Sequence, residues 1–214
     1  ITPVLAAGTH SIEIKASLAN GCMSLFTKSI IFYTLNISAT SSVPAVCQGS
    51  STTLTATSTN ATGYTWYKVG TASSLSTVPT INTGPLMDST TFKVVATNGS
   101  CIDSSFLGID VVKANFKASG DTTLCPGQSV NMTVPSTFNT ANWFILPANT
   151  AVGSGLSYTV TPSTTTSYRV VATTASPACS GSDTVIVTVR SVSLPVVSGP
   201  RGVCAGSTTS TYTS

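Results

Sequence analysis

Charged residues are scarce in this chain. They make up 7% of its 214 residues, whereas an average soluble domain has about 25%. The nine lysines and arginines and the six aspartates and glutamates are too dilute to form a basic patch, which argues against nucleic acid as a partner. Disordered chains combine few apolar residues with a high net charge. Here the apolar fraction is 41% and the net charge +3, so we predict a folded chain with a buried core.

Long apolar runs are also missing. The longest, at 29–35, is far shorter than the roughly 20 residues of a membrane helix, so no membrane span is predicted. The opening residues, ITPV, lack the charged and apolar regions of a signal peptide. For an extracellular protein, this leads us to expect that residue 1 is an internal position of a longer chain.

Residues that carry out catalysis or bind metals are few. The only histidine is His10, which precedes an alternating segment and is expected in an ordinary strand or loop position. Zinc-finger-like pairs of close cysteines are missing. The carboxylates do not recur as the matched pair that a glycosidase needs; they are Glu13, Asp88, Asp103, Asp110, Asp121 and Asp183. We therefore predict no catalytic, cofactor-binding or metal site, and a protein that is not an enzyme.

The residues that are abundant favour strands. Thr, Val, Ile and aromatic residues suit a pleated, half-buried surface, and 16 glycines and 11 prolines separate the strand-like runs. Serine and threonine fill most polar positions, so solubility must depend on hydroxyl groups. The composition predicts an all-β fold.

A repeat of just under eighty residues organises the sequence, which is a primary signal of tandem architecture. Trp66 and Trp143 follow the nearest upstream Cys-x-Gly motif by 19 and 18 residues. The six cysteines form two interleaved sets with spacings of 78 and 79 residues: Cys47, Cys125 and Cys204, each opening the pattern Cys-x-Gly-x-Ser/Thr, and Cys22, Cys101 and Cys179.

This period predicts two complete immunoglobulin-like (Ig-like) repeats, at 39–115 and 116–193. Residues 1–38 are expected to be the C-terminal part of a preceding repeat. Residues 194–214 are expected to start a following repeat. The predicted architecture is an extended tandem array of β-sandwich domains.

Each complete repeat contains about seven short alternating segments and one central tryptophan, which favours an Ig-like sandwich. A fibronectin-like or other Greek-key sandwich is the nearest alternative, and a small barrel is a third. Tyr67 and Phe144 alternate with the tryptophans and are better placed for surface contacts or for packing between neighbouring strands or chains. The predicted core residues are Trp66, Trp143, Phe92 and Tyr168.

Three stretches carry a resemblance to a known family. They are the segments 47–57 (CQGSSTTLTAT), 64–67 (YTWY) and 90–101 (TTFKVVATNGSC), with weaker copies in 125–179. They resemble the tandem Ig-like and PKD-like repeats of Bacteroidota surface proteins, including gliding-motility adhesins exported by the type IX secretion system. The resemblance implies that residues 194–214 begin an Ig-like or PKD-like repeat. It also implies an extracellular, cell-surface location and a structural role.

The cysteines of an extracellular β array are expected to form disulfides. Pairing within each repeat gives Cys47–Cys101 and Cys125–Cys179. However, Cys47 precedes the turn between the first two strands, and Cys101 lies between the last two. Strands of about eight residues would hold these turns about 25 Å apart, beyond the roughly 7 Å that a disulfide allows. We prefer an inter-repeat bond, Cys47–Cys179, and keep the intra-repeat pairing as the alternative.

A short motif, Asp followed by Ser or Thr and then an apolar residue or Thr, occurs at Ser89, Thr122 and Thr184. It resembles the O-glycosylation motif of Bacteroidota secreted proteins. These hydroxyls are therefore candidate O-glycosylation sites, and glycans would help to explain solubility with so few charges.

The leading functional hypothesis is a structural stalk or filament segment of a large secreted bacterial adhesin, in which repeats space and stiffen the fibre. Its partners would be neighbouring repeats, other copies in a filament, and surface glycans or proteins. Two alternatives remain: a repeat module that binds glycans or proteins, and an accessory region of a large secreted enzyme.

Overall fold

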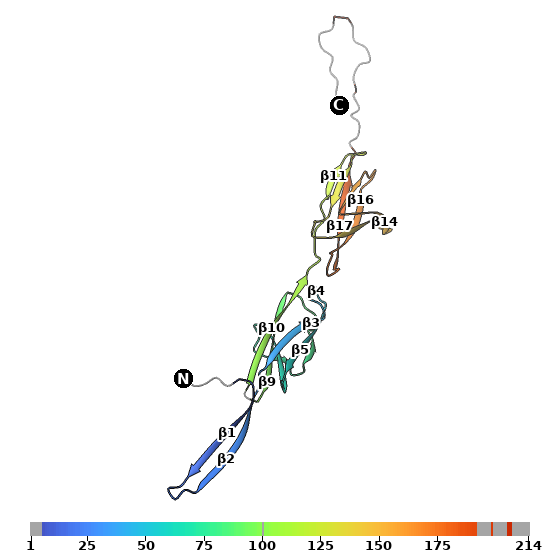
Figure 1. Ribbon diagram of the computed structural model, residues 1–214. Helices are drawn as coiled ribbons and strands as arrows, with labels where there is room; N and C mark the ends of the chain where they lie inside the picture. The colour runs from blue at the N-terminus through green and yellow to red at the C-terminus, as the bar shows by residue number, and fades with distance from the viewer. Residues whose placement is uncertain (1–5, 100, 192–197, 199–204, 207–214) are drawn as a thin grey trace. The chain divides into compact units, whose positions relative to one another are not determined.

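The computed structural model describes residues 6–99, 101–191, 198 and 205–206. The regular elements of these residues are β-strands (Figure 1), which confirms the all-β prediction. No helix in this part of the chain is long and apolar enough to cross a membrane. The chain divides into two compact units, Ile1–Ala114 with Ser176–Cys179, and Asn115–Ala175 with Ser180–Ser214.

The first unit contains a sandwich of eight strands. They are β3 (Asn36–Ser41), β4 (Ala45–Cys47), β5 (Thr53–Thr59), β6 (Gly63–Lys68), β7 (Ser74–Ser76), β8 (Thr80–Asn82), β9 (Thr90–Asn98) and β10 (Cys101–Val112). One sheet has the order β4-β10-β9-β6-β7 and the other β3-β5-β8. β4 runs parallel to β10, whereas β9 pairs antiparallel with both β10 and β6. The first strand of the sandwich is therefore divided between the two sheets, β3 in one and β4 in the other.

The core of this sandwich follows from the period-two alternation of its strands. In β9, Phe92, Val94 and Ala96 are buried, while the residues between them face outward. Trp66 of β6 is fully buried among them, and its indole N–H donates to the Pro79 carbonyl at 3.3 Å. That bond satisfies the one polar group of a large apolar side chain.

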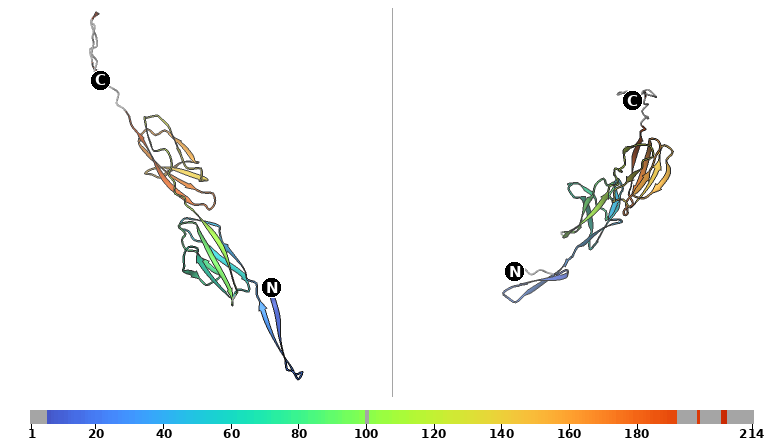
Figure 2. Two further views of the ribbon diagram at one scale, coloured as in Figure 1. Left: turned by 90° about the vertical axis from the view of Figure 1, so that its left-hand side faces the viewer. Right: turned by 90° about the horizontal axis from the view of Figure 1, so that it is seen from above.

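The first strand of the sandwich begins at Asn36, three residues before the expected start of the repeat at residue 39. Ile37 and Ala39 pack against the buried cluster, so the residues just before position 39 belong to the sandwich. Preceding it, β1 (Gly8–Ser17) and β2 (Met23–Phe32) form a two-stranded ribbon and pair with each other at ten positions (Figure 2).

The second unit repeats the arrangement of the first. Its strands are β11 (Thr122–Leu124), β12 (Val130–Thr133), β13 (Thr140–Ile145), β14 (Thr150–Ser154), β15 (Ser157–Val160), β16 (Thr166–Thr173) and β17 (Ser180–Val189). A five-stranded sheet has the order β11-β17-β16-β13-β14, and β12 pairs with β15. As in the first unit, the short first strand, β11, runs parallel to the last one, β17.

The position of β3 differs between the two units. In the second unit an isolated bridge between Ser119 and Thr133 takes its place, with amide–carbonyl bonds of 2.9 and 3.3 Å in the two directions. Gly120 has a φ of 126°, and a Cβ there would approach the Met132 side chain at 2.9 Å. The chain passes so close to the core at Gly120 that a side chain does not fit at this position.

Candidate functional site

Cys47 ends the short strand β4 and opens a tight turn. The Ser50 amide donates to the Cys47 carbonyl at 2.9 Å, and Gly49 has a φ of 81°, which residues with a side chain rarely adopt. The Gly49 amide also donates to the Leu86 carbonyl at 2.7 Å. The Cys-x-Gly motif therefore fixes how the Cys47 side chain leaves the end of the strand.

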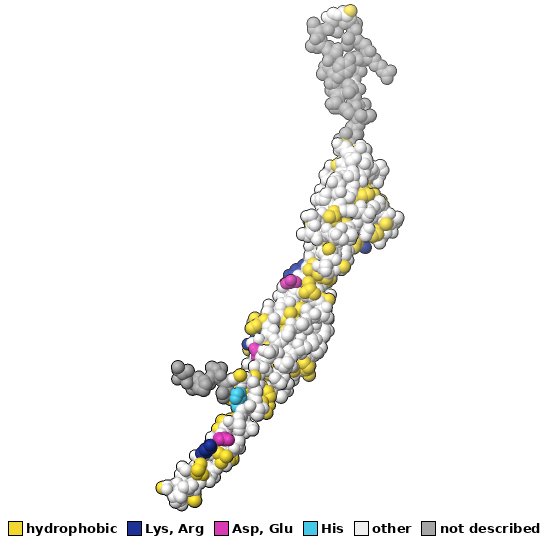
Figure 3. Space-filling view, viewed as in Figure 1, with side chains coloured by type: hydrophobic (Ala, Val, Ile, Leu, Met, Phe, Trp, Pro, Cys, Tyr) yellow, Lys and Arg dark blue, Asp and Glu magenta, His cyan; other side chains and the backbone are white. Residues whose placement is uncertain are grey.

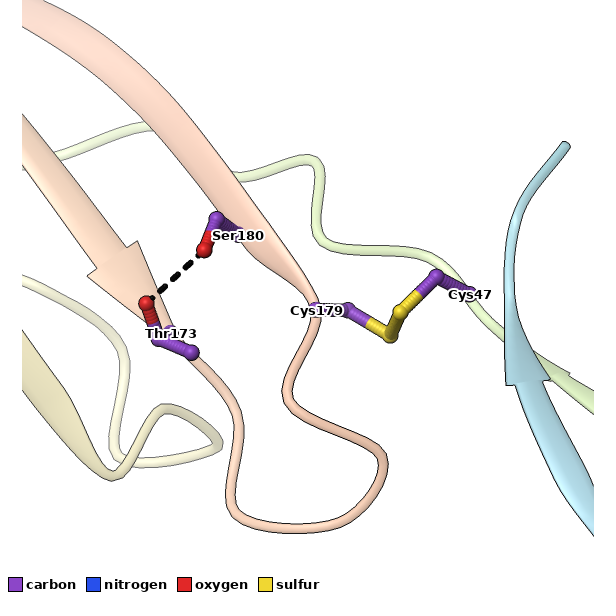
Figure 4. Close-up of a disulfide and its surroundings, with 4 residues drawn as sticks. All are labelled: Cys47, Thr173, Cys179 and Ser180. Carbon is purple, nitrogen blue, oxygen red and sulfur yellow. Dashed lines mark hydrogen bonds between the residues drawn. A yellow bond between two sulfur atoms is a disulfide. The ribbon is translucent and has the colours of Figure 1, made fainter. Parts of the chain in front are cut away.

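A disulfide joins Cys47 to Cys179, with an S–S distance of 2.06 Å and a Cα–Cα distance of 5.4 Å (Figure 4). Cys179 lies between β16 and β17 and is buried, and the segment Ser176–Cys179 belongs to the first compact unit. Beside it, the hydroxyls of Thr173 and Ser180 are 2.9 Å apart and join the ends of the two strands. The bond closes a covalent loop over a sequence separation of 132 residues.

The alternative pairing within a repeat, Cys47 with Cys101, is not the one that the structure contains. Cys47 pairs in register with Val112 at the end of β10, while Cys101 is the first residue of that strand. The strand is 12 residues long, and at about 3.3 Å per residue it holds its ends roughly 36 Å apart. A disulfide between them would need Cα atoms within about 7 Å. Cys125 and Cys179 are separated in the same way by β17, since Leu124 pairs with Val189.

Three other cysteines of the described residues are free: Cys22, Cys101 and Cys125. Cys125 opens a turn like that of Cys47, because the Gln128 amide donates to its carbonyl at 3.1 Å and Gly127 has a φ of 84°. Cys22 and Cys101 lie in hairpins, between β1 and β2 and at the start of β10. Cys204 falls outside the described residues.

The four residues predicted for the core are all buried: Trp66 and Trp143 have no exposed surface, Phe92 is 1% exposed and Tyr168 is 6% exposed. The Trp143 indole N–H donates to the Gly155 carbonyl at 2.9 Å, and the Tyr158 ring stacks on the indole with 6.2 Å between ring centroids. The tryptophans therefore stabilise the sandwiches and are not accessible to a ligand.

The aspartates fasten strands to one another. Asp103 of β10 accepts from the Ile37 amide at 3.3 Å, and Asp183 of β17 accepts from the Ala118 amide at 2.8 Å. In both units a carboxylate of the last strand thus holds the backbone at the beginning of the sandwich. Asp121 accepts from the Ile186 amide in the same part of the second unit. Among the described residues, no group of three or more His, Cys, Asp or Glu side chains comes together.

Among the described residues, Asp88 and Tyr168 have shifted pKa values. The Lys113 ammonium, 2.6 Å from the Asp88 carboxylate, lowers the pKa of Asp88 through a hydrogen bond and its charge. Burial raises the pKa of the Tyr168 hydroxyl, and the neighbouring Tyr158 adds to that rise. Asp88 lies on the surface and Tyr168 in the core, so the two groups do not form an acid–base pair.

The ribbon of β1 and β2 contains the single histidine. His10 shares a hydrogen bond of 2.8 Å with the Ala6 carbonyl, and its ring meets Phe32 edge-on with 5.2 Å between centroids. Glu13 forms an exposed ion pair with Lys15 at 3.8 Å. These contacts lie within one ribbon and bring together no nucleophile and base.

The outer face of the first five-stranded sheet carries a row of side chains that the sequence analysis did not single out as a set. Phe106 pairs in register with Lys93, and Lys93 with Tyr67. The Lys93 ammonium lies 5.6 Å from the centroid of the Phe106 ring, within reach of a cation–π interaction. These residues and the loop after β6 line a surface groove of about 470 Å³.

The second unit has a related row. Arg169 lies over Phe144, with 5.4 Å from the guanidinium carbon to the ring centroid, and it pairs in register with both Phe144 and Thr184. The signal in the sequence was a basic residue following the core aromatic at Lys93 and again at Arg169. On the face shown in Figure 3, charged side chains are otherwise sparse.

The three candidate glycosylation sites have different surroundings. Thr184 is exposed on β17, and Thr122 is half-buried on β11. Ser89 is exposed, but its hydroxyl accepts from the Val111 amide at 2.9 Å. Of the three, Thr184 has the surroundings that best suit a glycan.

Comparison with known proteins gives one family match. Residues 36–112 match the family model described as "Ig-like domain CHU_C associated", a range that runs from the first residue of β3 to the last residue of β10. No curated protein matches the chain.

Solved structures with a similar backbone have low sequence identity. Three N-terminal domains of the Hoc capsid protein of bacteriophage RB49 are 13% identical, with 87% of this chain and 80% of that one covered and a TM-score of 0.48. The titin I-band fragment I67–I69 is also 13% identical, over 72% and 65% of the two chains, with a TM-score of 0.45. Murine CEACAM1b is 10% identical over 72% and 100%, with a TM-score of 0.35.

Proposed function

Starting from the Ig-like domain at residues 36–112, we propose that the chain is a load-bearing segment of the stalk or filament of a large secreted bacterial adhesin. The Ig-like repeats space the fibre, and neighbouring repeats of the same chain are their first partners. We propose the gliding-motility adhesins of Bacteroidota as its relatives, and a location outside the cell is part of the same proposal. The Cys47–Cys179 disulfide supports this location, because disulfides persist in oxidising compartments.

The single observation that carries the proposal is the position of this disulfide in the chain. Cys47 lies in the repeat predicted at 39–115, and Cys179 lies in the repeat predicted at 116–193. A force that pulls the two ends of the chain apart passes along the backbone to Cys47, through the sulfur–sulfur bond, and onward from Cys179. The strands β5 to β16 lie inside the closed loop and are bypassed by the load.

This arrangement limits how far the segment can be extended. Without the bond, unfolding releases all residues between the two cysteines. Over a sequence separation of 132 residues and at about 3.5 Å per residue, that length is roughly 450 Å. With the bond intact, the length stays locked even if the sandwiches unfold. A fibre under intermittent pulling keeps its length in this way.

Single-molecule extension of the chain, held at its two ends, tests the load-bearing role. The oxidised chain is expected to lack the roughly 450 Å of released length that the reduced chain shows. The variant C47S is the matched control and should behave as the reduced chain does, with or without reductant. The same total length before and after reduction would contradict the proposal.

A glycan- or protein-binding module is the second candidate function, and the groove beside Phe106 favours it. Phe106 is 61% exposed, and Lys68 and Lys93 line the groove without a carboxylate among its lining residues. Aromatic residues are enriched in protein–protein interfaces. Binding to a panel of acidic and neutral glycans, compared between the parent chain and F106A, tests this function. Equal binding by both chains would speak against the groove.

Glycosylation at Thr184 is a proposal of the same kind. A sugar there would add polar surface to a chain with few charges, at an exposed position. Intact mass of the secreted protein, compared with that of the variant T184A, is the direct measurement. A mass equal to the bare polypeptide would remove this proposal and leave the stalk function unaffected.

A further inference from the structure

The cysteines of this chain occupy two kinds of position. Cys47 and Cys125, the turn cysteines, each follow a short strand that runs parallel to the last strand of its sheet. Each opens a turn whose third residue is a glycine with φ near 80°, and a backbone hydrogen bond returns to the cysteine carbonyl three residues later. The local structure that presents the Cys47 sulfur to its partner is therefore also present at Cys125.

Cys22, Cys101 and Cys179, the hairpin cysteines, lie where two long antiparallel strands are joined. Cys22 closes the turn between β1 and β2, since the Leu18 amide donates to its carbonyl at 2.9 Å. Cys101 pairs with Asn98 at the end of the β9–β10 ladder, and Cys179 directly precedes β17. These three positions recur with the period of the repeat.

The one disulfide of the described residues joins a turn cysteine to a hairpin cysteine. We infer that this is a general pairing rule: a turn cysteine forms a disulfide with a hairpin cysteine of an adjoining Ig-like unit. Cys125 would thus bond to a hairpin cysteine of another unit, and Cys22 and Cys101 would bond to turn cysteines of other units. The inference rests on the proposed stalk, in which such units adjoin, and it gives the kind of cysteine that each side of such a joint contributes.

Geometry excludes the simpler alternative in which the free cysteines bond within their own sandwich. The two kinds of position lie at opposite ends of the last strand, because Cys47 is in register with Val112 while Cys101 begins the same strand. The same strand geometry separates Cys125 from the hairpin of its own repeat. Each sandwich thus carries one kind of cysteine at each end, which makes the chain directional.

The free thiols are open to this reaction. Cys22 and Cys125 are exposed, and Cys101 is half-buried. Each new bond forms when two thiols lose two protons and two electrons, and glutathione disulfide, taken here as the oxidant, is reduced to two glutathione molecules. One sulfur–sulfur bond forms between the units for each one broken in the oxidant.

The test uses the full chain with Cys204 replaced by serine (C204S), so that each remaining cysteine lies in the described residues. At about 1 mM chain, the concentration of partner thiols matches the effective concentration that a short linker provides. In a glutathione redox buffer, copies are expected to become covalently linked, as seen on a non-reducing gel. Peptide mapping should join Cys125 of one copy to Cys22 or Cys101 of another.

Single serine variants in the same background separate the rule from random coupling. C125S leaves Cys47 as the only turn cysteine, and Cys47 is occupied by Cys179; its covalent oligomers are expected to be lost. C22S and C101S each keep one free hairpin cysteine and are expected to keep covalent dimers. Random coupling predicts that C125S still dimerises through Cys22 and Cys101.

Three results would overturn the inference: covalent dimers of C125S at the level of the parent, a main product that links Cys125 to Cys125, or a parent that stays monomeric while Cys47–Cys179 forms. Extension of the monomeric chain does not depend on these thiols. The load-bearing role can therefore fail or hold independently of the pairing rule.

Discussion

At the scale of single residues, the buried aromatic side chains set tight limits on their neighbours. Trp143 is fully buried, donates to the Gly155 carbonyl and stacks on Tyr158. The Tyr158 hydroxyl in turn donates to the Val152 carbonyl at 2.7 Å. A Cβ built on Gly153 would overlap the ring of Tyr158, so glycine is required here by space rather than by backbone conformation.

Replacing Gly153 by alanine is therefore expected to destabilise the second unit by about 1–3 kcal/mol, the usual cost of overpacking. Urea unfolding followed by circular dichroism measures the change. The control is G108A on β10, where a Cβ meets nothing within 4 Å, and little loss of stability is expected. If G153A is as stable as the parent, Tyr158 moves more freely than its contacts indicate.

Tyr168 gives the second unit a pH dependence. Burial raises the pKa of its hydroxyl above the usual value of 10.0, so the folded state holds this proton more tightly than the unfolded state. The stability that this proton contributes is fully present below the unfolded pKa of about 10. It is lost as the pH rises through the higher pKa of the folded state. The free energy of unfolding should fall over this range in the parent and fall less in Y168F. Parallel curves for the two proteins would contradict the assignment.

At the scale of elements, similar hairpins differ in what covers them. In β9 the alternate residues Phe92 and Val94 are buried against the other sheet of the sandwich. In the ribbon of β1 and β2, Ile14 is 59% and Phe26 is 60% exposed, although they pair in register on one face. A two-stranded ribbon without a packed face is marginally stable in water.

Hydrogen exchange should therefore separate the two hairpins. Amides of β9 and β10 are expected to exchange only on unfolding of the sandwich, whereas those of β1 and β2 should exchange at least about a hundred times faster. Mass spectrometry of peptides covering each hairpin measures both in one sample. Equal protection would show that the ribbon is covered by a partner in solution.

At the scale of the whole molecule, the Cys47–Cys179 bond reduces the conformational entropy of the unfolded state and therefore the entropy lost on folding. Closing a loop with a separation of 132 residues restricts the unfolded state, and the chain-entropy model gives about 5 kcal/mol for a loop of this size. Reduction, or the pair of changes C47S and C179S, should lower the unfolding temperature. Calorimetry with and without reductant measures it.

The control for this experiment is the pair of changes C101S and C125S, which removes two thiols that are free in the structure. It should leave the unfolding temperature close to that of the oxidised parent. No loss on reduction would show that the bond contributes little to stability. A large loss in this control would show that replacing free thiols by serine itself lowers the unfolding temperature.

The all-β class, the Ig-like sandwich and the buried core positions could be predicted from the amino-acid pattern, because period-two alternation and turn residues are local properties of the chain. Three features became evident only in the folded chain: the start of the first sandwich at Asn36, the division of its first strand between two sheets, and the row of Tyr67, Lys93 and Phe106. These depend on register between strands that are distant in sequence. The cysteine spacing alone allows both partners for Cys47. The expected strand length favoured Cys179, and the structure contains that bond, because the strand from Cys101 to Val112 holds Cys101 far from Cys47.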